Sequence, residues 1–283
     1  MAVGAVISLC LLMTSCTVTS IDDEQATTTS VATTTVVTTT SATPTTTTTQ
    51  HSTVAGTQKP SASTSQKVTV GGGSRSPILA APTTYTVDAS FFDDAVFVGD
   101  SVSLKLSYYA ASSGELGKAK FLTVGSFGVG NAIYDHPDTK LTYKGVAYTN
   151  AEEAIAATGA TKLFIMLGMN DIGRFGVSKS ITNWGTLLGL IRSTCPNITI
   201  YIQSMTPVWT GGERGGITNA NANSYNAQLK TFAEANGCKF IDIASYMKDS
   251  TGGLATAFCS DSYVHLTTDG AKTWVQVLKA YNY

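Results

Sequence analysis

The chain has only three histidines in 283 residues, so few side chains are available to act as a general base. Charged residues are also scarce, at 13% with a net charge of −1, which argues against a nucleic-acid partner. The sequence has no His-Glu-x-x-His motif, no Cys/His cluster and no glycine-rich phosphate loop. We therefore expect no metal and no cofactor.

Apolar runs long enough to span a bilayer are also missing. The N-terminal run 2–12 is too short to do so. Small residues follow it directly before Cys16, and this arrangement resembles a bacterial lipoprotein signal. The resemblance implies export and a lipid attached to Cys16, which would anchor the protein at the bacterial cell surface. A plain cleaved signal peptide, giving a secreted protein, is the alternative.

Three zones follow from the composition. Residues 1–16 form the signal segment, and 17–84 are dominated by Thr, Ser, Ala and Val without apolar alternation. Such a tract buries too little surface to fold, so we expect a disordered tether. Residues 85–283 have the composition of one globular domain, which we expect to be monomeric.

Within this domain, strand and helix patterns alternate. Thr149 and Glu152 have the spacing of a capping box that opens a helix, and Gly159 closes it. This order predicts an α/β fold, a three-layer α/β/α sandwich with a five-stranded parallel sheet. The expected strands are 95–99, 120–124, 162–167, 198–203 and 239–243; the other expected helices are 102–111, 181–193, 221–236 and 268–281, and 141–148 is expected to form a hairpin.

Polar residues cluster where the expected strands end. Ser101 follows the first strand, a glycine turn at 125–131 follows the second, and Asn170 follows the third. Asp261 and His265 precede the last helix. Ligands of parallel sheets bind beyond the carboxyl ends of the strands, so these groups are expected to meet. A serine, an imidazole and hydrogen-bond donors are what acyl transfer requires.

The order Gly-Asp-Ser, a glycine turn, Gly-x-Asn-Asp and a C-terminal histidine resembles the SGNH hydrolase superfamily, or GDSL-type esterases. The resemblance implies a flavodoxin-like fold, with Ser101 as nucleophile and His265 as base. The oxyanion hole would consist of the Ser101 N–H, the Asn170 side chain and one N–H of the glycine turn. Gly130 is our choice for the last donor, and Gly128 remains open.

The acid that orients the histidine departs from the family pattern. The family usually has an aspartate three residues before the histidine, where this chain has Ser262, whereas Asp261 lies four before. Either Asp261 reaches His265 from an altered loop, or a backbone carbonyl orients the ring of a Ser–His dyad. We favour Asp261. Of the other histidines, His51 lies in the threonine-rich tract and His136 is expected at the surface.

Two cysteines, Cys195 and Cys238, precede the last two strands, and the sequence leaves a disulfide or two free thiols equally open. The glycine-rich loop with Trp209 and Arg214, together with Tyr108, is expected to overhang the pocket and bind substrate.

The function expected from these features is an extracytoplasmic serine esterase that removes short acyl groups, acetyl above all, from carbohydrate polymers. Its partner would be an acylated carbohydrate. The alternatives are a lysophospholipase or short-chain lipid esterase, and a non-catalytic surface binding module on the same fold.

Overall fold

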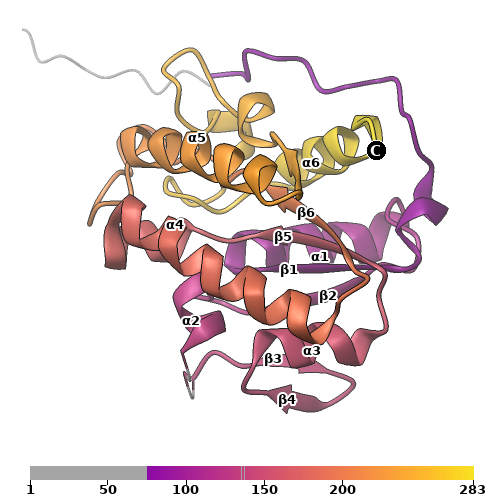
Figure 1. Ribbon diagram of the computed structural model, residues 1–283. Coiled ribbons are helices and arrows are strands. Elements are labelled where there is room, and N and C mark those ends of the chain that lie inside the picture. The colour runs from indigo at the N-terminus through magenta and orange to yellow at the C-terminus, as the bar shows by residue number, and fades with distance from the viewer. Residues whose placement is uncertain (1–74, 135, 137) are drawn as a thin grey trace, which may run out of the picture. The chain divides into compact units, whose positions relative to one another are not determined.

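The computed structural model describes residues 75–134, 136 and 138–283, within the second of two compact units, Lys67–Tyr283 (Figure 1). The predictions for 1–16 and for 17–74, including lipidation of Cys16, lie outside the described residues. A five-stranded, fully parallel sheet forms the centre, with strand order β2-β1-β5-β6-β7. Its strands are β1 (Ala95–Gly99), β2 (Lys120–Thr123), β5 (Lys162–Met166), β6 (Thr199–Gln203) and β7 (Lys239–Ile241).

Helices cover both faces of this sheet. α1 packs with α6 on one face, and α3, α4 and α5 lie side by side on the other (Figure 1). The predicted three-layer α/β/α sandwich with a five-stranded parallel sheet is therefore confirmed. The helices are α1 (Ser101–Ser113), α2 (Val129–Ile133), α3 (Ala151–Thr158), α4 (Met169–Thr194), α5 (Asn219–Ala235) and α6 (Thr268–Ala280).

A row of aromatic rings crosses the sheet and forms part of the core. Phe121, Phe97, Phe164 and Tyr201 stand in register on four neighbouring strands. Successive ring centroids lie 5.1, 4.7 and 4.5 Å apart with nearly parallel planes. Burial of apolar surface of this kind is the main favourable contribution to folding. It is available here because helices cover the sheet on both faces.

The five expected strands agree with the observed ones within two residues at each end. The predicted hairpin is also present, as β3 (Leu141–Tyr143) and β4 (Val146–Tyr148). The prediction for α4 was wrong at its start, because the helix begins at Met169 instead of at residue 181. Gly176, with φ 73°, interrupts it, and the short glycine-rich segment before this kink has no clear helical periodicity.

The predicted capping box of α3 was wrong by one residue. Asn150 is the N-cap, and its side-chain amide donates to Glu153 Oε1 over 3.0 Å. Gly159 ends the helix in the left-handed conformation, as expected. The cysteine alternatives are also decided, since Cys195 and Cys238 are free thiols in this structure.

The segment before β1 lies against the domain. Arg75 Nε is 3.2 Å from Asp249 Oδ2, the Ile78 N–H donates to Lys248 O, and the Thr86 N–H donates to Lys279 O. The chain therefore contacts the domain from Arg75 onward, about ten residues before the expected boundary. Within the described part of the chain, no helix is both long and apolar enough to cross a membrane.

Candidate active site

The Ser101 hydroxyl sits at the junction of β1 and α1, where the sequence placed it. Asp100 is the N-cap of α1, and its Oδ1 accepts the Val102 N–H at 2.9 Å and the Ser103 N–H at 3.4 Å. Gly99 makes this junction tight, because a Cβ there would collide with the Ser103 side chain. Ser101 is thus held at the carboxyl edge of the sheet, on the first turn of a helix.

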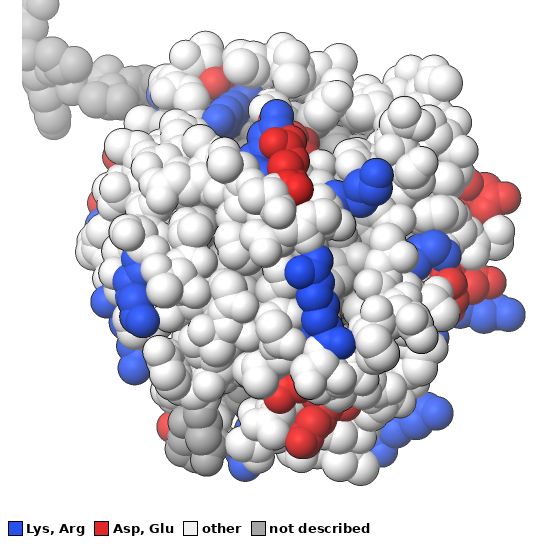
Figure 2. All heavy atoms as spheres, viewed as in Figure 1, with Lys and Arg blue, Asp and Glu red and all other residues white. Residues whose placement is uncertain are grey.

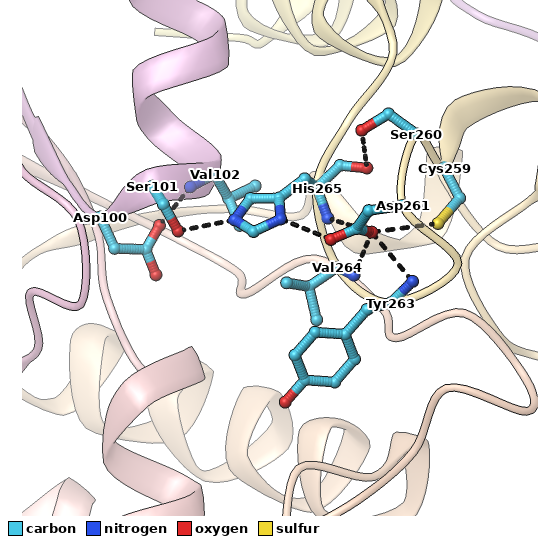
Figure 3. A network of polar contacts seen from close by, with 9 residues as sticks. All are labelled: Asp100, Ser101, Val102, Cys259, Ser260, Asp261, Tyr263, Val264 and His265. Atoms are coloured by element: carbon cyan, nitrogen blue, oxygen red, sulfur yellow. Dashed lines mark hydrogen bonds and ion pairs between the residues drawn. The ribbon is translucent and has the colours of Figure 1, made fainter.

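His265 reaches Ser101 from the loop before α6 (Figure 3). Its Nε2 lies 3.0 Å from Ser101 Oγ, a hydrogen-bonding distance, although the two residues are 164 positions apart. The imidazole side chain is 43% exposed, which leaves it open to a substrate and to water. An imidazole at this distance is able to take the hydroxyl proton.

Asp261 completes a chain of three side chains. Its Oδ2 lies 2.6 Å from His265 Nδ1, and its Oδ1 accepts the backbone N–H groups of Tyr263, Val264 and His265 (Figure 3). Ser262 has a left-handed φ of 57°, and the tight turn at this residue brings the aspartate to the ring. The sequence left two alternatives for the group that orients His265. In the structure, the Asp261 carboxylate and not a backbone carbonyl contacts the His265 ring.

This environment keeps Asp261 ionised. Partial burial acts to raise its pKa, but the His265 side chain and the backbone N–H groups of His265 and Tyr263 outweigh burial, so that the pKa is lowered. An ionised carboxylate on Nδ1 keeps the proton on that nitrogen and leaves Nε2 free to accept one.

Asn170 lies in the first turn of α4. Its amide nitrogen donates to Phe127 O at 3.0 Å and to Asp100 Oδ2 at 3.3 Å, which ties it to the residue before Ser101. Gly168, with φ 138°, precedes it, and a Cβ there would collide with the ring of Tyr225. Only glycine therefore fits the turn that aims Asn170 at this edge.

The N–H groups of the predicted glycine turn donate to side chains of the protein in this structure. The Gly130 N–H donates to Asp171 Oδ1 at 2.9 Å, and the Gly128 N–H donates to Asn131 Oδ1 at 3.0 Å. Asp171 also accepts the Val129 N–H, so its carboxylate occupies the N-terminus of α2. Both glycine N–H groups are thus paired within the protein, as the Asn170 amide also is.

Two buried carboxylates, Asp100 and Asp171, are next to Ser101 and Asn170 in the chain. Burial raises the pKa of Asp100 to about 6, despite the two backbone donors, and the nearby charge of Asp171 adds to the rise. Burial also raises the pKa of Asp171, while the N–H groups of Gly130 and Val129 act in the opposite direction.

An open depression of about 540 Å³ adjoins Ser101 and His265. Tyr108 lines it, as predicted for a substrate-binding residue, together with Leu104 and Lys105 of α1. Ser260 and residues 266–268 form the opposite wall. The sequence interpretation missed Lys105, although Ser101, Lys105 and Tyr108 have the i, i+4, i+7 spacing of one helix face.

Trp209 and Arg214 were predicted to bind substrate, but they do not line this depression. The Trp209 N–H donates to Tyr263 O over 2.7 Å, and the Arg214 guanidinium lies 3.4 Å from the centre of the Tyr263 ring. Both residues therefore support the loop that carries Asp261 and His265. The reason is that the loop after β6 folds back through paired backbone bonds between Arg214 and Ile217.

A smaller recess of about 230 Å³ lies beside Asn170. His136, expected at the surface, is half-buried in its wall with Arg174 and Phe175. Among the described residues, no cluster of three or more His, Cys, Asp or Glu side chains has the arrangement of a metal site.

Comparison with known proteins gives a consistent result. A sequence model of the GDSL-like lipase/acylhydrolase family matches residues 109–273, more than half of the chain. The match begins after the Gly-Asp-Ser segment, so Ser101 lies outside the matched residues. No curated protein sequence matches the chain.

Several solved structures share the fold. A GDSL-like lipase from Bacteroides thetaiotaomicron is 16% identical, with a TM-score of 0.52 over 71% of this chain and 90% of that one. A Streptococcus pneumonia protein, provisionally described as a platelet activating factor, is 17% identical, with a TM-score of 0.51 over 68% and 89%. At such identities the likeness establishes the fold alone.

Proposed function

The chain belongs to the GDSL-like lipase/acylhydrolase family and is a carboxylic ester hydrolase, and from this premise we propose an extracytoplasmic serine esterase that removes short acyl groups from carbohydrate polymers. The observation that carries the proposal is the uninterrupted line from Ser101 Oγ through the His265 ring to Asp261, with distances of 3.0 and 2.6 Å. This arrangement has the geometry of a nucleophile, a general base and an orienting acid.

In the proposed reaction, Ser101 Oγ bonds to the acyl carbon while its proton moves to His265 Nε2. The resulting tetrahedral intermediate breaks its bond to the alcohol oxygen, and His265 returns the proton to that oxygen. Water then attacks the acyl-serine with His265 again as base, which releases the acid and restores Ser101. Asp261 balances the charge of the protonated ring in both steps.

The developing oxyanion is stabilised by the Ser101 N–H and the Asn170 amide. Asn170 shares one donor with Asp100 at 3.3 Å, its longer hydrogen bond. An oxyanion beside Ser101 competes for this contact, which is the weaker of the two because it is the longer.

The wall of the depression supports a carbohydrate as the substrate. The depression is wide and open, about 540 Å³, with the exposed Tyr108 ring on one wall and Ser260, Thr267 and Thr268 on the opposite wall. An aromatic ring facing polar residues suits a sugar bearing a small acyl group. The lipoprotein-like segment at 1–16 and the threonine-rich tract at 17–84 support a location outside the cytoplasm, on a tether from the cell surface.

The test compares wild-type protein with Ser101→Ala on p-nitrophenyl acetate and on longer acyl esters, together with acetate release from acetylated xylan, peptidoglycan and chitin oligomers. We expect acetate to be the preferred acyl group and Ser101→Ala to lose several orders of magnitude in kcat. More than a few per cent of activity left in Ser101→Ala would contradict the nucleophile assignment. A preference for long acyl chains would favour the alternative function of a lipid esterase. No hydrolysis of any ester would favour a non-catalytic binding module.

A further inference from the structure

The depression beside Ser101 has one strongly basic side chain on its wall. Lys105 lines it one helical turn after Ser101, and no Asp or Glu does so. Among the described residues, Lys105 has no carboxylate within ion-pair distance, whereas Lys162 pairs with Asp94 and Lys279 with Glu115. Lys105 is a partly buried residue, and a lysine without an ion-pair partner that lines the same depression as Ser101 is available to a ligand.

The chemistry of the site determines which part of the substrate lies there. His265 must return a proton to the alcohol oxygen, so the alcohol part of the ester extends along the side that His265 occupies. His265 lines the depression with Lys105, whereas Asn170, which faces the carbonyl oxygen, lines the separate recess of about 230 Å³. Lys105 therefore faces the alcohol part of the substrate and not the acyl group.

The attraction at this position is local. The net charge of the chain is −1, and the face seen in Figure 2 has scattered basic and acidic side chains among mostly uncharged ones. The near-neutral chain therefore supplies no strong overall cationic field that would attract any anion. The exposed ring of Tyr108, three residues after Lys105, lines the same depression and offers an apolar surface there.

We infer that the alcohol part of the substrate carries a negative charge: the substrate is an acylated glycan with sugar carboxylates, one of which binds Lys105 while a sugar ring lies on Tyr108. This inference rests on the proposed esterase function and narrows its substrate class. Lys105 would be a specificity-determining residue, since it contacts the leaving group and not the bond that breaks.

The first experiment uses two esters that differ only in the charge of the alcohol part, 4-acetoxybenzoate and 4-acetoxybenzamide. The measured quantity is the ratio of kcat/KM for the anionic ester to that for the neutral ester. In Lys105→Gln we expect this ratio to fall about tenfold, the equivalent of one charge-assisted hydrogen bond, mainly through KM. Lys105→Arg should restore most of it, because the charge is kept.

Lys118→Gln is the matched control. It removes the same charge from an exposed residue outside the depression, so the ratio should stay at the wild-type value. Raising NaCl from about 0.01 to 1 M shortens the Debye length from about 30 to 3 Å, and the wild-type preference for the anionic ester should shrink accordingly.

The second experiment extends the test to polymers, with O-acetylated polygalacturonate against O-acetylated xylan. We expect wild type to favour the first and Lys105→Gln to lose that preference. An unchanged ratio in Lys105→Gln, with both esters still hydrolysed, overturns this inference alone. Failure of wild type to hydrolyse any ester overturns the proposed function as well. A Lys105-dependent loss on lysophosphatidylglycerol micelles but not on polygalacturonate also overturns it, because the anion would then be a lipid phosphate.

Discussion

At the scale of single residues, Asp261 shows how one backbone angle decides the role of a side chain. Counted along the sequence, Ser262 stands where the family acid usually does, yet the carboxylate on the histidine ring comes from the residue before it. The left-handed φ of 57° at Ser262 tightens the turn, and three backbone N–H groups then fix Asp261 Oδ1. Its other oxygen is left to face His265.

Replacing this acid tests the triad. Asp261→Asn should lower kcat for p-nitrophenyl acetate by several orders of magnitude, because the amide disturbs the tautomer of His265 and leaves the protonated ring without a counter-charge. Steady-state kinetics at neutral pH measure the loss. Ser262→Ala is the control and should stay close to wild type, since Ser262 is exposed and away from the ring. Activity of Asp261→Asn within about threefold of wild type would leave a Ser–His dyad.

The amide of Asn170 has a separate prediction. Asn170→Ala should lower kcat by about 10²–10³ with little change in KM, because the lost donor acts on the oxyanion and not on the bound ester. The variant also loses the hydrogen bonds to Phe127 O and Asp100, so its melting temperature is measured in parallel. A change confined to KM would make Asn170 a substrate-binding residue instead.

At the scale of elements, the loop after β6 supports the loop that carries the acid and base. Trp209 donates to Tyr263 O, Arg214 lies over the Tyr263 ring, and Gly212 approaches the backbone at Ser262 so closely that a Cβ would collide with it. On its other side, this loop contacts α4 at Gly173. One loop thus packs against both segments that carry site residues, 169–173 and 261–265.

A methyl group at Gly212 tests this arrangement. Gly212→Ala should destabilise the protein by about 1–3 kcal/mol and lower kcat, because the carbonyl of Ser262 must move and the Asp261–His265 pair moves with it. Gly189→Ala is the matched control on α4, where a Cβ meets open space, and it should stabilise by up to about 1 kcal/mol. Chemical denaturation and ester kinetics check both variants. Wild-type kcat in Gly212→Ala would show that the loop does not position His265.

At the scale of the whole molecule, the buried Asp100 makes stability depend on pH. Its folded pKa of about 6 exceeds the ordinary value of 3.8, so between these values the folded protein binds more protons than the unfolded chain. The free energy of unfolding therefore falls as pH rises through this window. Burying a carboxylate costs free energy, and two contacts of Asp100 offset part of this cost: it caps α1 and accepts a hydrogen bond from the Asn170 amide.

Asp100→Asn isolates this effect, because asparagine caps helices as well as aspartate does. The free energy of unfolding of wild type minus that of the variant should fall by roughly 3 kcal/mol at most as pH rises, mainly between pH 4 and 6, from a shift of about two units. Urea denaturation at several pH values gives the curve. A difference that does not change with pH would show that Asp100 has an ordinary pKa in the folded state.

The sequence by itself determined the sheet, the hairpin and the pairing of Ser101 with His265. Apolar runs of four to six residues, ended by glycine or polar residues, are a local signal, and parallel strands bring their carboxyl ends to one edge whatever the helices do. Ser101, Asn170 and His265 could therefore be expected together before any contact was known.

Only the tertiary structure decided the contacts that depend on a neighbour distant in sequence. Asp171 accepts the N–H of Gly130, the expected oxyanion donor, and the turn at Ser262 brings Asp261 to the His265 ring. The guanidinium of Arg214, expected to bind substrate, lies over the Tyr263 ring. Each of these outcomes depends on hydrogen bonds and packing between segments that share no local pattern, because a backbone N–H or a guanidinium binds whichever partner the fold brings near.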